Sequence, residues 1–160
     1  GRSSLVAYKP ETSTLLWSII PRERGGNDAY GGHFNSPVIA DLDRNGSLEV
    51  MVSNRAAVGI FSGMDGSALS CQEKDCPEGM FVAYTASTLR GTPVVSDIDN
   101  NGTLELIIGG GNSSYRGRGF LYAWTDFESD LGSEAGTLSP GSIAWGSGRG
   151  NAARTGHYEP

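Results

Sequence analysis

Residues 36–54 read SPVIADLDRNGSLEVMVSN, and residues 92–110 read TPVVSDIDNNGTLELIIGG. The two stretches lie 56 residues apart and are identical at eight of nineteen positions, and most of the other positions exchange similar residues. A stretch that recurs at such a spacing is the signature of a structural repeat. We therefore expect the chain to contain two copies of one structural unit.

Each stretch carries the pattern Asp-x-Asp-x-Asn-Gly-x-x-Glu. Alternating acidic side chains around a sharp glycine turn supply the oxygen ligands that hard cations such as Ca²⁺ prefer. The pattern is not an EF-hand, because its last acid stands at the ninth position and its flanks read as strands. The alternative is a pair of metal-free Asx-rich turns. The predicted ligands are Asp41, Asp43, Asn45, the Ser47 carbonyl and Glu49 at one site, and Asp97, Asp99, Asn101, the Thr103 carbonyl and Glu105 at the other.

The segments on both sides of each acidic pattern read as β-strands. PVIAD and PVVSD each begin with a proline that suits the first residue of a strand, and LEVMVS and LELIIG are apolar runs typical of strands covered on both faces. Buried strands that recur about every 50 residues favour the blades of a propeller. The predicted fold class is all-β, a partial β-propeller of about two to three four-stranded antiparallel blades with calcium-binding loops.

The pattern P-x-x-x-D-x-D-x-N-G-x-x-E resembles the FG-GAP/VCBS-type calcium-binding repeat of integrin-α-like β-propellers and of many secreted bacterial proteins. The resemblance is strong over the two stretches and looser over residues 1–125, and it implies two Ca²⁺ sites. Asn45 and Asn101 stand where many members carry a third Asp, and members that close a ring usually have about seven blades. The tail at 145–158 resembles the segment that follows the last blade in such proteins, which implies a packing role for Trp145, Arg149 and Arg154.

The repeat predicts one all-β domain over residues 1–160. Its parts are a half-blade hairpin plus connector at 1–35, a first calcium blade at 36–91, a second calcium blade at 92–144 and a packing tail at 145–160. We expect the hairpin either to close onto the last blade of its own chain or, the favoured alternative, to dock on a neighbouring subunit. The chain begins with Gly and shows no signal peptide, so we expect a processed product or part of a longer chain.

Composition indicates the environment of the protein. The net charge of −6 argues against a nucleic-acid partner, and no apolar run approaches the ~18 residues of a membrane helix. Cys71 and Cys76 flank a short polar loop and are predicted to form a disulfide, with two free thiols as the alternative. A disulfide and calcium sites together favour an extracellular or cell-surface location. Asn112 is a possible glycosylation site.

The sequence shows no catalytic machinery outside the acidic loops, since it lacks a phosphate-binding loop, a nucleophile elbow and a separate acid–base pair. We therefore expect no enzyme. The predicted function is an extracellular calcium-stabilised module with a structural or adhesive role that self-assembles by strand or hairpin addition or binds another extracellular protein or glycan. One alternative is a fragment of a secreted propeller enzyme such as a polysaccharide lyase, with Trp17, Trp124 or Tyr115 facing sugar. The other is a propeller domain that binds a protein ligand.

Overall fold

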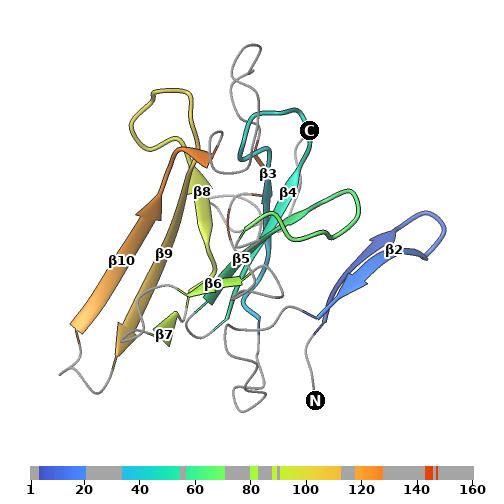
Figure 1. The fold of residues 1–160 in the computed structure, drawn as a ribbon, viewed down its shortest axis with the longest axis horizontal. Helices are drawn as coiled ribbons and strands as arrows, with labels where there is room; N and C mark the ends of the chain where they lie inside the picture. Colours follow the sequence, from blue (N-terminus) through green and yellow to red (C-terminus); the bar gives the residue numbers. More distant parts are fainter. Residues whose placement is uncertain are drawn as a thin grey trace.

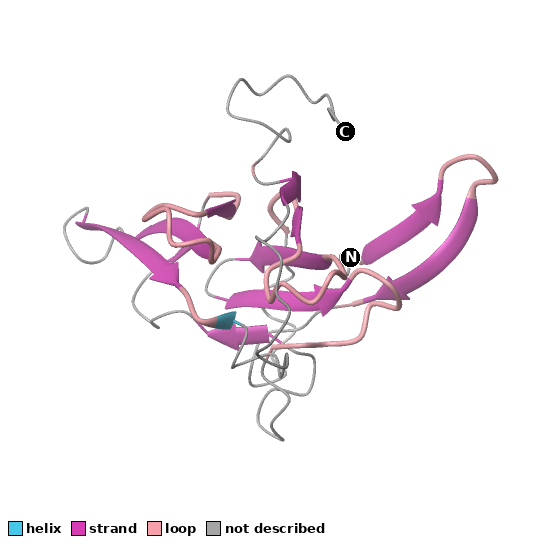
Figure 2. Cartoon of the chain, turned by 90° about the horizontal axis from the view of Figure 1, so that it is seen from above, coloured by secondary structure: helices cyan, strands magenta, loops and turns pink. Residues whose placement is uncertain are grey.

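The computed structural model describes residues 4–20, 34–54, 57–70, 80–82, 88–89, 91–112, 118–127, 143–145 and 147. The named elements are all strands, and the only helical residue in this part of the chain is Phe127 (Figure 2). None of these residues belongs to a helix that is long and apolar enough to span a bilayer. The prediction of an all-β chain is therefore confirmed. The strands are β1 (Leu5–Lys9), β2 (Thr14–Ile19), β3 (Val38–Ala40), β4 (Glu49–Asn54), β5 (Ala57–Ser62), β6 (Met80–Val82), β7 (Thr88–Leu89), β8 (Val94–Ser96), β9 (Glu105–Asn112), β10 (Arg118–Trp124) and β11 (Ile143–Trp145).

The strands form three antiparallel sheets that lie side by side (Figure 1). The hairpin consists of β1 and β2. The central sheet has the order β11-β3-β4-β5-β6, and the distal sheet has the order β10-β9-β7, with β8 also paired to β9. The described strands do not close into a ring, and the sheets have two, five and four strands.

Each acidic pattern connects two antiparallel neighbours, as the sequence predicts. The first runs from β3 to β4, where Ala40 pairs with Glu49, and the second runs from β8 to β9, where Ser96 pairs with Glu105. The glutamate of each pattern is thus the first residue of its strand. This register holds the two ends of each loop together.

Two short strands belong to a different sheet from the one that the repeat boundaries assign. β7 lies within residues 36–91 but pairs with β9 of the distal sheet, and β11 lies at the end of residues 92–144 but pairs with β3 of the central sheet. Strands this short carry little sequence pattern of their own. Their pairing depends on which sheet edge is free to accept them.

The central and distal sheets pack face to face over one core. The buried side chains come from both acidic-loop strand pairs and from the loops themselves, and Figure 2 shows the two sheets from above. The largest of those that are fully buried are Leu42, Met51, Ile60, Leu106 and Ile108. Because β3, β4, β8 and β9 all contribute to this core, it determines where the two acidic loops lie.

The hairpin lies on the other face of the central sheet. Trp17 is buried there against Val52 and Phe61, and its indole Nε1–H donates a hydrogen bond to the Gly63 carbonyl over 3.0 Å. Gly66 has a φ of 75°, and a Cβ atom at this position would come within 2.9 Å of the Trp17 ring. The hairpin forms as predicted, and among the described residues it packs on the central sheet and not on the distal sheet. Docking of the hairpin on a neighbouring subunit stays a prediction.

Candidate metal centre

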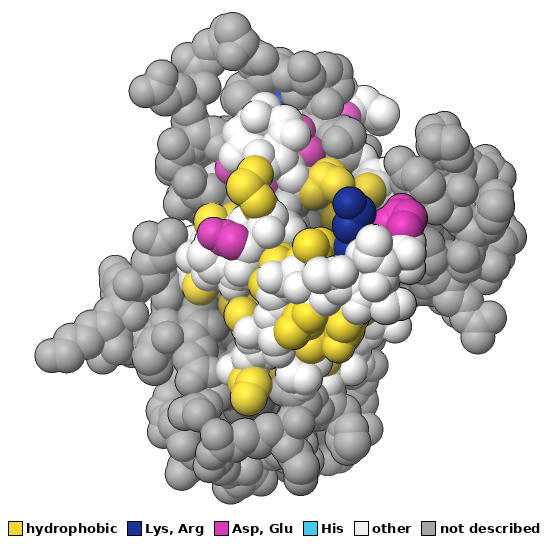
Figure 3. Space-filling model, turned by 90° about the vertical axis from the view of Figure 1, so that its right-hand side faces the viewer, with side chains coloured by type: hydrophobic (Ala, Val, Ile, Leu, Met, Phe, Trp, Pro, Cys, Tyr) yellow, Lys and Arg dark blue, Asp and Glu magenta, His cyan; other side chains and the backbone are white. Residues whose placement is uncertain are grey.

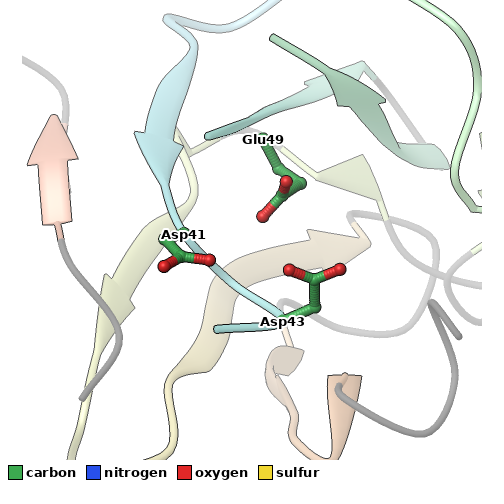
Figure 4. Close-up of side chains that lie close together, drawn as sticks. All are labelled: Asp41, Asp43 and Glu49. Carbon is green, nitrogen blue, oxygen red and sulfur yellow. The ribbon is translucent and has the colours of Figure 1, made fainter. Parts of the chain in front are cut away.

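The first acidic loop, residues 41–49, gathers three carboxylates. β3 ends at Ala40, so Asp41 follows directly, while Glu49 begins β4. The chain reverses through left-handed backbone at Arg44, with a φ of 61°, and at Gly46, with a φ of 89°. Asp41, Asp43 and Glu49 each offer an oxygen within 4.8 Å of the others, and Figure 4 shows them together.

Backbone amides of the same loop hold these carboxylates in place. The Leu42 N–H donates to Glu49 Oε2 over 2.7 Å, and the Gly46 N–H donates to Asp41 Oδ2 over 3.1 Å. Asp43 accepts hydrogen bonds from the backbone N–H and the side-chain amide of Asn45. Hydrogen bonds within the loop therefore hold the acids in this arrangement.

The three carboxylates are removed from water, since Asp41 is 4 % exposed and Glu49 is 1 % exposed. Asp41 Oδ1 is buried and accepts no hydrogen bond from the described residues. An unpaired carboxylate oxygen in such a place is costly unless a cation or a proton satisfies it. The cluster thus has the charge, the geometry and an open ligand atom that fit a bound cation.

Burial also shifts the acid strength of these groups. It raises the pKa of Glu49 from 4.5 to about 7, with further contributions from the negative charges of Asp43 and Asp41. The pKa of Asp41 is raised as well, chiefly by burial, although the hydrogen bond from Gly46 opposes the change. Both groups would hold their charge more readily beside a cation.

The second acidic loop, residues 97–105, has the same construction. Its left-handed residues are Asn100 and Gly102, with φ of 59° and 88°. The Ile98 N–H donates to Glu105 Oε2 over 2.8 Å, and the Gly102 N–H donates to Asp97 Oδ2 over 2.9 Å. The three carboxylates of this loop, Asp97, Asp99 and Glu105, also offer one oxygen each within 4.8 Å of the others.

The second loop differs in its surroundings. Asp99 is exposed and Asp97 is half-buried, whereas their counterparts in the first loop are buried. Asp97 Oδ1 accepts a hydrogen bond from the Asn101 N–H over 3.1 Å, whereas Asp41 Oδ1 has no partner in the described part of the chain. Glu105 Oε1 accepts one from the Thr125 hydroxyl over 3.4 Å. The carboxylates of the second cluster are therefore more exposed to water than those of the first, and the oxygen equivalent to Asp41 Oδ1 has a hydrogen-bond partner.

Thr125 is the site residue that sequence reasoning missed. It follows β10, in which Trp124 pairs with Leu106, and this register brings it beside Glu105. The only signal in the sequence is its position one residue beyond an aromatic strand. That signal becomes readable only when the register of β9 and β10 is known.

The other predicted ligands lie on the same loops. The side-chain oxygens of Asn45 and Asn101 accept hydrogen bonds from the backbone N–H groups of Ser47 and Thr103, each over 2.7 Å. These amides therefore stabilise the turn. Ligation by the two asparagines and by the carbonyls of Ser47 and Thr103 stays a prediction.

The remaining candidate residues lie apart from the clusters. Cys71, Cys76, Tyr115, Arg149 and Arg154 fall outside the described residues. Asn112 ends β9, where its backbone pairs with Arg118, and its glycosylation stays a prediction.

The structure shows how the tryptophans pack, and their contact with sugar stays a prediction. Trp17 is buried on the central sheet, and its indole N–H is engaged. Trp124 is partly buried against the core and stacks on Tyr122, with the ring centroids 5.6 Å apart. The backbone of Trp145 belongs to β11, at the edge of the central sheet.

Among the described residues, both candidate clusters consist of carboxylates alone. Oxygen-only ligand sets favour hard divalent cations such as Ca²⁺, Mg²⁺ and Mn²⁺ over the metals that histidine and cysteine select. The structure thus contains two clusters that could hold such ions, and their spacing along the chain follows the sequence repeat. No family model, curated protein or solved structure matches this chain.

Proposed function

We propose that this chain is an extracellular calcium-stabilised repeat module of the propeller type, with a structural or adhesive role. The observation that carries the proposal is the first acidic loop, in which the carboxylates of Asp41, Asp43 and Glu49 are buried together. One oxygen of Asp41 has no hydrogen-bond partner in the described residues. A bound cation would satisfy that oxygen and neutralise the cluster.

Calcium is the cation that this loop favours. Ca²⁺ accepts six to eight oxygens in flexible geometry, whereas Mg²⁺ demands a near-ideal octahedron and keeps several of its waters. The loop is a short turn that gathers three carboxylates, which suits the more tolerant ion. Weak calcium sites are filled where calcium is abundant, which supports the extracellular location.

A structural role fits the position of the clusters better than a catalytic one. Glu49 is 1 % exposed, so a substrate could not reach its carboxylate without opening the loop. Each cluster also connects neighbouring strands of a sheet that contributes to the main core. A cation there would therefore hold two strands together, and the proposal assigns it no chemical step.

Thermal unfolding with and without calcium tests the proposal. A ligand that binds only the folded state stabilises it by mass action, by about 2.7 kcal/mol at a hundredfold excess over its dissociation constant. We expect added Ca²⁺ to raise the melting temperature above its value in excess chelator, and isothermal titration to give two sites per chain. Equimolar Mg²⁺ should have a smaller effect.

Asp65→Asn is the matched control variant. Asp65 lies in an exposed turn and accepts hydrogen bonds from the backbone and hydroxyl of Ser67, as the loop acids do, but it belongs to neither cluster. This variant should keep the full response to calcium. A melting curve that is the same in excess chelator and in excess calcium would exclude the proposal.

A further inference from the structure

The central and distal sheets each present the same face to the sheet that precedes them in the chain. In β4, Val50 and Val52 face the hairpin, while Met51 faces the distal sheet. Fifty-six residues later, Leu106 and Ile108 of β9 occupy the positions of Val50 and Val52, and they face the central sheet. Each sheet thus turns the same face, here called its rear face, toward the sheet that precedes it.

The hairpin follows the same rule. Tyr8 pairs with Leu15, and the counterparts 53 residues later, Phe61 and Ala68, form the equivalent bridge. By this alignment Leu5 and Ala7 correspond to Val58 and Ile60. Leu5 and Ala7 pack on the central sheet, and Val58 and Ile60 pack in the core shared with the distal sheet. Their common face, here called the forward face, therefore meets the next sheet in both cases.

The forward face of the distal sheet has no sheet upon it among the described residues. Leu42 is 1 % exposed, but its counterpart 56 residues later, Ile98, is 57 % exposed. Val58 pairs with Ser53 and is 0 % exposed, whereas Leu121 pairs with Gly109, the counterpart of Ser53, and is 76 % exposed. Val94, the counterpart of the buried Val38, is exposed too. The residues that pack the central sheet against the distal sheet thus have apolar counterparts on the forward face of the distal sheet, and those counterparts are exposed to solvent.

The rear face of the hairpin is exposed in the same way. Val6, Tyr8 and Leu16 alternate along their strands with the residues that contact the central sheet. Tyr8 is 55 % exposed, whereas its counterpart Phe61 is 2 % exposed beneath the hairpin. Figure 3 views the molecule from the hairpin side and shows hydrophobic side chains grouped on this surface.

We infer that these two surfaces bind each other between copies of this chain, the forward face of one distal sheet against the rear face of the next copy's hairpin. The molecule already joins a forward face to a rear face twice, from the hairpin to the central sheet and from the central to the distal sheet. A second copy would add one more contact of the same kind, between the forward face of a distal sheet and the rear face of a hairpin. The inference rests on the structural role proposed above, but it does not depend on the bound ion.

Such a contact is heterologous, because each copy contributes a different surface. Repetition of the contact gives a closed ring if the rotation per copy closes, and an open filament if it does not. This mode of assembly differs from strand addition, since the sheets meet by their faces and the strand edges are not used.

A complementation experiment tests the inference. Leu121→Glu blocks the forward face, Leu16→Glu blocks the rear face, and Met64→Glu places the same charge at an exposed hydrophobic residue in the turn after β5. Mass in solution is measured by light scattering and sedimentation from low to high protein concentration, in calcium. We expect the wild type and Met64→Glu to form oligomers, and Leu121→Glu and Leu16→Glu to remain monomers at concentrations at least tenfold higher.

The mixture of the two blocked variants gives the decisive result. Each variant keeps the surface that the other has lost, so an equimolar mixture should form dimers and stop there. A wild type that stays monomeric throughout would overturn the inference and would show that other residues of the chain cover the two faces. Oligomers of Leu16→Glu alone would overturn it as well, because they would indicate a symmetric contact. The calcium-dependent melting of the same samples reports separately on the metal sites.

Discussion

The two acidic loops share one backbone but not one environment. Both have left-handed residues at the fourth and sixth positions, and in both the glutamate accepts the N–H of the second residue. The first loop is buried because Leu42 at its second position enters the core, whereas Ile98 at the same position of the second loop meets solvent. Local sequence therefore determines the turn, and the neighbouring layer determines its electrostatics.

This difference separates the roles of the two loops in stability. Like charges repel more strongly in the first loop, because burial lowers the effective dielectric constant around them. The first loop therefore needs a cation more, and gains more from it, than the second loop does. The comparison can be tested with pairs of variants that make the same change at equivalent positions.

The largest difference is expected for the apolar residue at the second position of each loop. Leu42→Ala removes a fully buried side chain and should cost about 2–5 kcal/mol of unfolding free energy, whereas Ile98→Ala should stay within about 0.5 kcal/mol. Chemical denaturation at concentrations where the chain is monomeric measures both. Equal costs would mean that the two loops lie in equivalent surroundings.

A smaller difference is expected for the first aspartate of each loop. Asp41→Asn should remove most of the calcium stabilisation that the first site supplies, roughly 2–3 kcal/mol at a hundredfold excess of the ion. Asp97→Asn should remove less, because its cluster is more exposed to water. The measurement is the change in melting temperature between chelator and calcium for each variant. A larger loss for Asp97→Asn would reverse the order of the two sites.

The smallest difference concerns pH in the metal-free protein. The folded-state pKa of Glu49 is about 7, above its ordinary value of 4.5, so between these values the folded state binds more protons than the unfolded state. Stability should therefore be greatest at the acidic end of this range and fall as pH rises through 7. Melting curves in chelator from about pH 5 to 8 should show this slope in the wild type, and a flatter one for Glu49→Gln. A slope in Glu49→Gln equal to that of the wild type would contradict this prediction.

Much of the fold follows from local pattern. The apolar runs beside each acidic motif and the hairpin near the start of the sequence form as the sequence predicts. The acids of each motif also converge as predicted, because the loop closes through its own backbone amides. These features depend on residues close together in the chain, and such interactions can be read without a tertiary structure.

The sequence by itself determined the strands beside each acidic motif, the two turns and the identity of the clustered acids, since a short loop brings its own residues together whatever surrounds it. Only the tertiary structure decided that the hairpin packs its Trp17 on the central sheet, that β7 and β11 join sheets outside their own repeats, and that one acidic loop is buried while the other is open. Those outcomes depend on which faces and edges meet across long stretches of chain. Equivalent residues such as Leu42 and Ile98 read alike in the sequence, and they differ only because one has a layer packed upon it.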